Sequence, residues 1–227
     1  MDTPIIEFSG VGFSHMPEKP LFKDVSVRFN PHSFNLIQGA SGCGKTTFLR
    51  LMNRMEKPLA GEILFKGKPL SSYPPPLLRR SVLLLQQIPT VIDGTVADNL
   101  LLPYKFKNNR DLDKPDNNRL TSLLEDFCLQ GVDLKDNART LSVGQLQRVC
   151  FVRAMLLSPE VLLLDEPASA LDEESCRIVE QTAEMLCRDK GLTVFMVSHR
   201  RFRPKEIRPF LFTIEKEALR ETKWNLA

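Results

Sequence analysis

The sequence lacks any long apolar run. Among its 227 residues, no run approaches the roughly 20 apolar residues that a membrane-spanning helix needs. The first residues, Met1-Asp2-Thr3-Pro4, also lack the basic and apolar segments of a signal peptide. We therefore expect a cytosolic protein that reaches a membrane only through a partner.

Cysteine, histidine and net charge are also low. The five cysteines are odd in number and include no C-x-x-C pair, which predicts reduced thiols and excludes a disulfide framework or a zinc site. The three histidines are too scattered to predict a metal centre. A net charge of +3 does not favour a nucleic-acid partner, because DNA-binding proteins usually concentrate basic residues on one face. The basic cluster at 200–205 is therefore predicted to be a solvated loop.

The sequence does contain an alternation of strand and helix patterns. Strands are predicted at 5–8, 25–29, 34–37, 62–67, 81–85, 161–164 and 193–197, and helices at 46–53, from 77, at 143–157 and at 175–188. The β-rich first forty residues predict an N-terminal antiparallel β subdomain. The continuous apolar runs at 161–164 and 193–197 are typical of parallel strands buried on both faces. The fold class is therefore α/β.

A glycine-rich loop follows the third predicted strand and opens a predicted helix. Its residues are Gly39-Ala40-Ser41-Gly42-Cys43-Gly44-Lys45-Thr46-Thr47. This context is that of a phosphate-binding loop, whose glycines let the backbone point N–H groups at phosphate oxygens. We expect Lys45 to reach the β- and γ-phosphates, Thr46 to ligate Mg²⁺ and Thr47 to contact the α-phosphate. The alternative, a chance glycine turn, is disfavoured by the strand–helix context.

Two acids end the apolar strand at 161–164. In phosphate-loop folds the position of Asp165 holds Mg²⁺, usually through water. Glu166 follows it directly. The alternative is that Asp165-Glu166-Pro167 merely starts a helix.

Between these motifs, Ser142 heads the helix predicted at 143–157. Serine is a strong N-cap residue, and a capped helix is the simplest interpretation. However, Leu141-Ser142-Val143-Gly144-Gln145 lies between a phosphate loop and an acidic strand, and the combination resembles the signature of ATP-binding cassette (ABC) ATPases. The family usually has glycine where Val143 stands. The resemblance covers about residues 5–214.

The resemblance implies further roles within one subunit. Glu166 would orient and deprotonate the attacking water, and His199 would contact the γ-phosphate. Gln87 would touch Mg²⁺ or that water and sense a transporter partner; Gln86 is the competing residue, but the spacing to Pro89 favours Gln87. Adenine would stack on His15 or Phe13, which align with a segment where the family often has tyrosine.

The resemblance also implies partners. Ser142, Val143, Gly144 and Gln145 would act on ATP bound to a second copy, and Asp172, in Ser169-Ala170-Leu171-Asp172, would cross the dimer interface. Two Mg·ATP molecules would lie between the copies, and a separate permease would recruit the dimer to the cytoplasmic face of the inner membrane.

The helical pattern between the two nucleotide motifs predicts a subdomain. We predict a single ABC ATPase domain, 1–227, in which 1–88 and 159–227 form a phosphate-loop NTPase core and 89–158 form an inserted helical subdomain. A helix at 89–102 and its neighbours would form the surface that docks the permease. The apolar candidates for that surface, which could equally be core, are Ile88, Val91, Ile92, Leu101 and Tyr104.

Within the family, the segments 87–89, 94–100 and 102–103 look closest to the ATP-binding subunit of a small bacterial iron-export transporter. The alternative is a soluble ABC ATPase that acts on nucleic acid in repair or translation. Such chains usually carry coiled-coil insertions or tandem cassettes, and this sequence shows neither.

Overall fold

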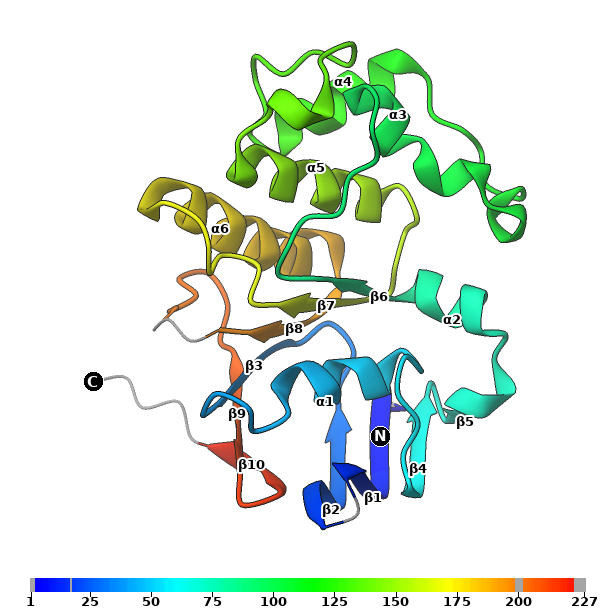
Figure 1. The fold of residues 1–227 in the computed structure, drawn as a ribbon, viewed down its shortest axis with the longest axis vertical. Coiled ribbons are helices and arrows are strands. Elements are labelled where there is room, and N and C mark those ends of the chain that lie inside the picture. Colours follow the sequence, from blue (N-terminus) through cyan, green and yellow to red (C-terminus); the bar gives the residue numbers. More distant parts are fainter. Residues whose placement is uncertain (1–2, 17, 199–201, 223–227) are drawn as a thin grey trace.

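The first strands form an antiparallel sheet because their residues alternate between core and solvent. The structure, a computed structural model, describes residues 3–16, 18–198 and 202–222 (Figure 1). The first sheet has the order β2-β1-β4-β5. Its strands are β1 (Ile6–Met16), β2 (Lys19–Phe29), β4 (Ala60–Phe65) and β5 (Lys68–Pro69). β1 extends well past residue 8, where the sequence pattern predicted its end. A register shift between Phe8 and Val11, beside Gly10 with φ +60°, interrupts the alternation of buried and exposed residues there, and so the pattern does not reveal that the strand continues.

The second sheet is mostly parallel, as its apolar strands predict. Its order is β10-β9-β3-β8-β7-β6, with only the β9–β10 pair antiparallel. Its strands are β3 (Phe34–Gly39), β6 (Val82–Leu85), β7 (Val161–Asp165), β8 (Thr193–Val197), β9 (Phe210–Glu215) and β10 (Ala218–Thr222). Every residue of β7 and β8 is buried. The predicted α/β fold class is confirmed.

Alternate residues of the central strands enter two different cores. Leu162 and Leu164 of β7 point into one core, whereas Val161 and Leu163 point into the other. The core that contains Val161 and Leu163 also contains α1 (Lys45–Met52) and the inner face of the antiparallel sheet. The core that contains Leu162 and Leu164 also contains α6 (Glu173–Lys190) and the helical part of the chain. The parallel sheet is thus covered on both faces, and this packing holds its strands, together with the residues at their ends, in place.

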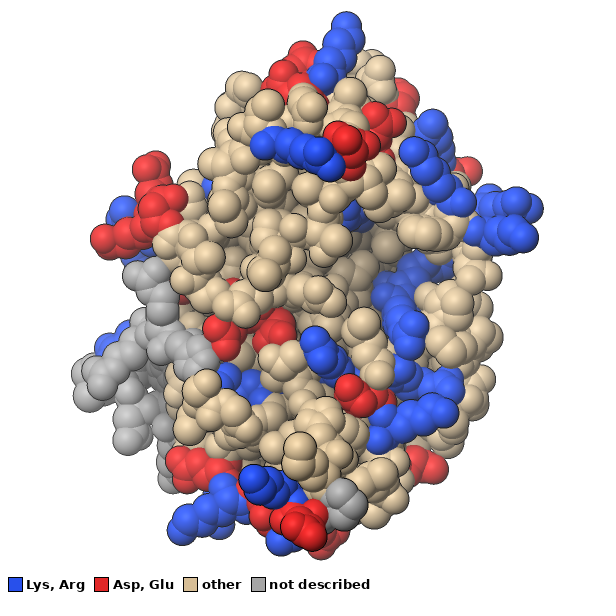
Figure 2. All heavy atoms as spheres, viewed as in Figure 1, with Lys and Arg blue, Asp and Glu red and all other residues tan. Residues whose placement is uncertain are grey.

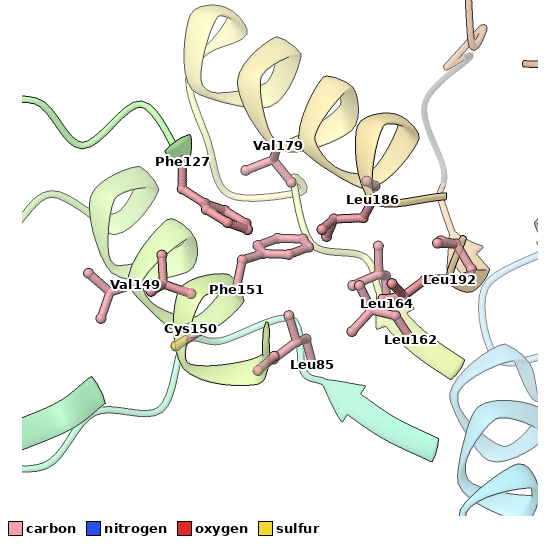
Figure 3. Close-up of a cluster of buried hydrophobic side chains, with 14 of the residues drawn as sticks. Leu85, Phe127, Val149, Cys150, Phe151, Leu162, Leu164, Val179, Leu186 and Leu192 are labelled. Atoms are coloured by element: carbon pink, nitrogen blue, oxygen red, sulfur yellow. The ribbon is translucent and has the colours of Figure 1, made fainter. Parts of the chain in front are cut away.

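Phe151 joins the helical part to the parallel sheet. Its ring is fully buried, and Figure 3 shows it among Phe127, Val179 and Leu164, which come from three other elements. Phe151 belongs to α5 (Val143–Met155). Truncation of such a residue typically costs about 3–5 kcal/mol, so this contact holds α5 firmly against α6 and β7.

The segment predicted to be helical at 89–158 contains α3 (Val96–Leu100), α4 (Asn117–Asp126) and α5, which lie at the top of Figure 1. In the described part of the chain the remaining helices are α2 (Pro75–Ser81) and four 3₁₀ turns, η1 (Leu70–Ser72), η2 (Leu102–Lys105), η3 (Lys107–Asn109) and η4 (Ala138–Thr140). Among the described helices, none combines the length and apolar character needed to cross a bilayer.

The prediction of a helix at 89–102 is wrong. Helix α3 begins only at Val96, after Thr95 and Asp98 form a capping box. The residues before it are non-helical because the Asn99 side chain occupies their backbone: it accepts from Ile92 N at 2.7 Å and donates to Ile92 O at 3.1 Å. These bonds make an ordered loop of the segment that leads from β6 to α3.

Candidate functional site

The glycine loop connects β3 to α1 on the surface of the molecule. Gly44 is the N-cap of α1 with φ +103°, and Gly42 has φ +77° with open space around it. Both conformations favour glycine. Ala40, Ser41 and Gly42 are exposed. The loop therefore presents its backbone to solvent at the N-terminus of a helix, as a phosphate site requires.

Lys45 folds back over this loop. Its ammonium group is buried and donates to Gly39 O and Ala40 O, each at 3.0 Å. These acceptors are neutral carbonyls, so a phosphate oxygen would be a stronger partner for the ammonium. Lys45 is thus placed where a phosphate on the loop would meet it.

Thr46 and Asp165 meet between α1 and the end of β7. The Thr46 hydroxyl donates to Asp165 Oδ1 at 3.0 Å. Burial raises the pKa of the Asp165 carboxyl above its ordinary value, while the bond from Thr46 opposes the rise. The described residues contain no cluster of three or more His, Cys, Asp or Glu side chains that could hold a metal. A hydroxyl and one carboxylate nevertheless suit Mg²⁺, which takes its remaining ligands from phosphates and water.

Glu166 follows Asp165 in a backbone conformation that is unusual for its type. Its φ is +51°, in the left-handed region that residues other than glycine rarely adopt. Its N–H donates to Val197 O at 3.2 Å, and its carbonyl accepts from Ser169 N at 3.2 Å. Residues held in such conformations often lie at functional sites. The carboxylate is therefore carried by a backbone that neighbouring strands and turns hold in place.

Gln87 lies at the end of β6 and reaches the segment after β7. Its Nε2 donates to Ser169 Oγ at 3.0 Å. The side chain is exposed. The structure thus brings Gln87 to the same edge of the sheet as Asp165 and Glu166, which is the carboxyl edge where α/β folds bind ligands.

His15 and Phe13 lie side by side on β1 but differ in depth. Their rings meet edge to face with centroids 4.9 Å apart. His15 is exposed, and its Nε2 lies 3.3 Å from Thr47 Oγ1. Phe13 is only 6% exposed and belongs to the core. Phe13 therefore lies behind the His15 ring, and of the two expected stacking residues His15 is the exposed one beside the loop.

The signature residues cap the start of α5. Gln145 N donates to Ser142 Oγ at 3.2 Å and Ser142 N donates to Gln145 Oε1 at 2.9 Å, forming a capping box. Val143 is 49% exposed, so a side chain larger than glycine fits there. Gly144 packs on α6, where a Cβ would lie 2.7 Å from Ser175 Oγ.

The signature and the loop before α6 lie next to each other. Asp172 is the N-cap of α6 and accepts from Ser175 N at 2.9 Å, and the hydrogen bonds from Ser175 lower the pKa of its carboxyl. Because Gly144 also contacts Ser175, the N-termini of α5 and α6 meet at one point. No hydrogen bond among the described residues joins residues 141–145 to residues 39–47. His199 lies outside the described residues.

Two contacts of the site were not predicted from the sequence. Ser169 bonds Gln87 and Glu166 at once. Cys176 donates its thiol to Ala168 O at 3.1 Å and thus holds the loop after Glu166. The bond from Gln87 joins residues 82 positions apart and so has no local sequence signal, whereas the Ser169–Glu166 and Cys176–Ala168 bonds join residues three and eight positions apart.

Comparisons with known proteins identify the family of this chain. A family model described as ABC transporter matches residues 22–169. The chain is 33% identical over 198 residues to the probable iron export ATP-binding protein FetA of Escherichia coli (strain K12), covering 87% of this chain and 86% of that protein. It is 34% identical over 211 residues to a sophorolipid transporter of Starmerella bombicola, covering 86% of this chain but spanning only 16% of the transporter's length.

Solved structures show the same fold. CbiO1 from Clostridium perfringens, part of the ABC transporter complex CbiONQ, superposes with a TM-score of 0.80 at 21% identity, covering 96% of this chain and 87% of that chain. A dimeric post-hydrolysis state of the ATP-binding cassette MJ0796, bound to ADP and Pi, gives 0.79 at 24% identity, covering 96% and 98%. The chain belongs to the ABC transporter family and is one of its ATPases.

Proposed function

We propose that two copies of this chain bind Mg·ATP between them and hydrolyse it to drive a separate membrane permease. One observation supports the proposal: among the described residues, no hydrogen bond joins the phosphate loop to the helix N-terminus capped by Ser142. The phosphate loop, Asp165 and Glu166 converge at one edge of the sheet, whereas the helix N-terminus capped by Ser142 lies apart from them. A second copy would supply its Ser142 helix to the ATP held by the first.

Each residue has a role in this proposal. Lys45 and the loop N–H groups bind the phosphates, and His15 stacks on the base. Thr46 and Asp165 would hold Mg²⁺, which neutralises phosphate charge when it is bound. Glu166 accepts a proton from the attacking water, and Gln87 and His199 orient that water and the γ-phosphate.

The Glu166→Gln variant tests this assignment. Glutamine keeps the shape of glutamate but cannot take a proton, and loss of a general base typically slows a reaction by about 10²–10⁴-fold. ATP binding should persist, because Lys45 and the loop are unchanged. The variant should therefore accumulate as an ATP-bound dimer in size-exclusion chromatography, and Lys45→Ala in the same chain should return it to a monomer. Near-normal turnover by Glu166→Gln would show that another group is the base.

We infer that the permease docks over α2 and the loop between β6 and α3. Ile88 is 77% exposed there, and Phe106 is 57% exposed at the end of η2. Figure 2 shows this face hollowed below the helical part, with Lys and Arg side chains gathered at its right, over α2, whose last turn carries Arg79 and Arg80. Val91, Ile92, Leu101 and Tyr104 are partly buried, so they form the base of this surface.

Ile88→Asp is the matching test. The substitution should leave the ATPase activity of the isolated chain unchanged, because Ile88 is on the surface. It should abolish co-purification with the permease from detergent-solubilised membranes. An unchanged yield of the complex would place the docking surface elsewhere.

The identity to FetA leads us to propose a metal ion, iron in the first place, as cargo. Deletion of the gene should then raise cellular iron, and only the unsubstituted gene, not Glu166→Gln, should restore it. An unchanged metal content would leave a non-metal cargo, as the likeness to a sophorolipid transporter illustrates.

A further inference from the structure

The hydroxyl of Ser169 lies between Gln87 and Glu166. Gln87 Nε2 donates to Ser169 Oγ at 3.0 Å, and Ser169 Oγ donates to Glu166 O at 3.1 Å. Gln87 follows β6, whereas the other two residues follow β7. A single side chain therefore joins the beginning of the segment that leads to α3 with the residue proposed as catalytic base.

The direction of these bonds follows from counting protons. A serine hydroxyl has one proton and two lone pairs. Because Ser169 gives its proton to Glu166 O, it can only accept from Gln87. The Gln87 amide must then present its NH₂ group to Ser169, which leaves its Oε1, an acceptor, for other partners such as water. If the Gln87 amide were turned over, its Oε1 would need the Ser169 hydroxyl proton as a donor, and the bond from Ser169 to Glu166 O would break.

The bonds also hold the Glu166 backbone. Its carbonyl accepts from Ser169 through both N and Oγ, while its N–H donates to Val197 O at 3.2 Å. With φ at +51°, this peptide is maintained only because its surroundings fix it. Ser169 is itself fixed, since the single thiol proton of Cys176 is shared between Ala168 O at 3.1 Å and Leu171 O at 3.4 Å, on either side of it.

We propose that Ser169 is a positioning residue that couples Gln87 to Glu166, so that displacement of the β6–α3 loop by a docked partner reaches the catalytic carboxylate through one hydroxyl. This inference rests on the proposed roles of Gln87 and Glu166. It adds a means of regulation to those roles, because turnover then depends on the hydrogen bonds of the Ser169 hydroxyl, which involve neither ATP nor the signature helix.

Ser169→Ala removes both bonds and should lower kcat about three- to tenfold, the range expected for the loss of one or two neutral hydrogen bonds. The Kd for ATP, measured in EDTA to prevent turnover, should change less than about twofold, because the phosphate loop is untouched. Ser169→Thr retains a hydroxyl and should restore most of kcat. Adding Gln87→Ala to Ser169→Ala should lower kcat by less than the product of the two single losses, because both changes break the same Gln87–Ser169 bond.

Ser72 provides a matched control. It is also exposed and donates its hydroxyl to the carbonyl three residues earlier, Pro69 O, at 2.7 Å, far from the site in the chain. Ser72→Ala should lower the unfolding temperature about as much as Ser169→Ala while leaving kcat unchanged. This comparison separates loss of a local turn bond from loss of the coupling.

The proposal fails if Ser169→Ala turns over ATP normally, if threonine does not rescue it, or if the double variant shows fully additive losses. Glu166→Gln is measured in parallel. If Glu166→Gln retains near-normal turnover, the assignment of the base is wrong. If Glu166→Gln is inactive and Ser169→Ala is normal, only the coupling is wrong.

Discussion

The hydroxyl of Thr46 donates to Asp165 Oδ1 at 3.0 Å and so joins the first residues of α1 to the end of β7. This bond offsets part of the cost of burying the Asp165 carboxylate, whose pKa burial raises. Burial therefore disfavours the ionised form of this carboxyl in the free protein, and the bond from Thr46 only partly compensates.

Asp165→Asn should stabilise the free protein while abolishing ATPase activity. A carboxyl whose folded-state pKa is raised binds its proton more tightly in the fold, so the fold loses stability as pH rises from the ordinary pKa to the raised one, and the loss is complete above both. At neutral pH, asparagine removes that penalty and still accepts from Thr46. The unfolding temperature should rise by about 2–4 °C for each kcal/mol regained, and the difference should shrink as pH falls towards 4.

Asp172→Asn is a control, because the pKa of the Asp172 carboxyl is shifted in the opposite direction to that of Asp165. Hydrogen bonds from Ser175 lower the pKa of the Asp172 carboxyl. Its ionised form therefore contributes stability above the ordinary pKa, and that contribution is lost as pH falls through the lowered pKa. Asp172→Asn should lower the unfolding temperature at pH 7 and converge with the unsubstituted protein in acid. Destabilisation by Asp165→Asn at pH 7, measured by calorimetry, would contradict our account of the buried carboxylate.

Much of this arrangement could be predicted because parallel α/β sheets place their chemistry where strands end. The chain from β3 through Gly44 to Lys45 has the predicted strand–loop–helix order, and Asp165 ends β7 as expected. The sequence pattern could not predict how deeply each side chain is buried. Phe13 and His15 share one face of β1, as residues two apart must, yet one is core and the other exposed, because His15 lies past the edge of the core.

Contacts between segments that are distant in the chain could not be predicted from the sequence either. Nothing local to Gln87 indicates that its amide meets Ser169, because that meeting depends on the pairing of β6 with β7. The error at 89–102 was of another kind. Thr95 and Asp98 form a capping box whose sequence spacing already indicates a helix beginning at Val96.

His15→Ala should weaken ATP binding, whereas Phe13→Ala should weaken the fold. Stacking of a base on an aromatic ring is worth about 1–3 kcal/mol by alanine substitution, so His15→Ala should raise the Kd for ATP about five- to 150-fold at an unchanged unfolding temperature. Phe13 is buried, and its truncation should cost about 3–5 kcal/mol. Equilibrium binding and calorimetry on both variants distinguish the two roles; normal ATP affinity in His15→Ala would exclude the stacking.

Maleimide should inactivate the enzyme through Cys43. Cys43 is partly exposed within the phosphate loop, and Cys128 is exposed, whereas Cys150, Cys176 and Cys187 are buried. Burial also raises the pKa of the Cys187 thiol to about 11, which further suppresses its reaction. Mass spectrometry of the native protein should therefore show two labelled thiols, with ATP protecting only Cys43. Cys43→Ser should resist inactivation and Cys128→Ser should not; an equally sensitive Cys43→Ser protein would show that the damage occurs elsewhere.

Gly144→Ala should uncouple the signature from the loop before α6. A Cβ at Gly144 would lie 2.7 Å from Ser175 Oγ and 2.9 Å from Ser175 Cβ, closer than such atoms approach. Either α5 or α6 must shift at its first turn, and both turns carry groups proposed to meet the second copy, Ser142 and Asp172. We expect ATP-dependent dimerisation and kcat to fall together, while ATP binding by the phosphate loop stays normal.

Ser175→Gly in the same chain makes this prediction specific. Removing the serine side chain clears both close contacts, so the double variant should regain dimerisation although glycine in a helix costs up to about 1 kcal/mol. Ser175→Ala should rescue less, because the β-carbon that would lie 2.9 Å away remains. Rescue in the order glycine, then alanine, then serine would show that the clash, and not a loss of flexibility at residue 144, causes the defect. Equal defects in all three backgrounds would instead show that residue 144 acts independently of α6.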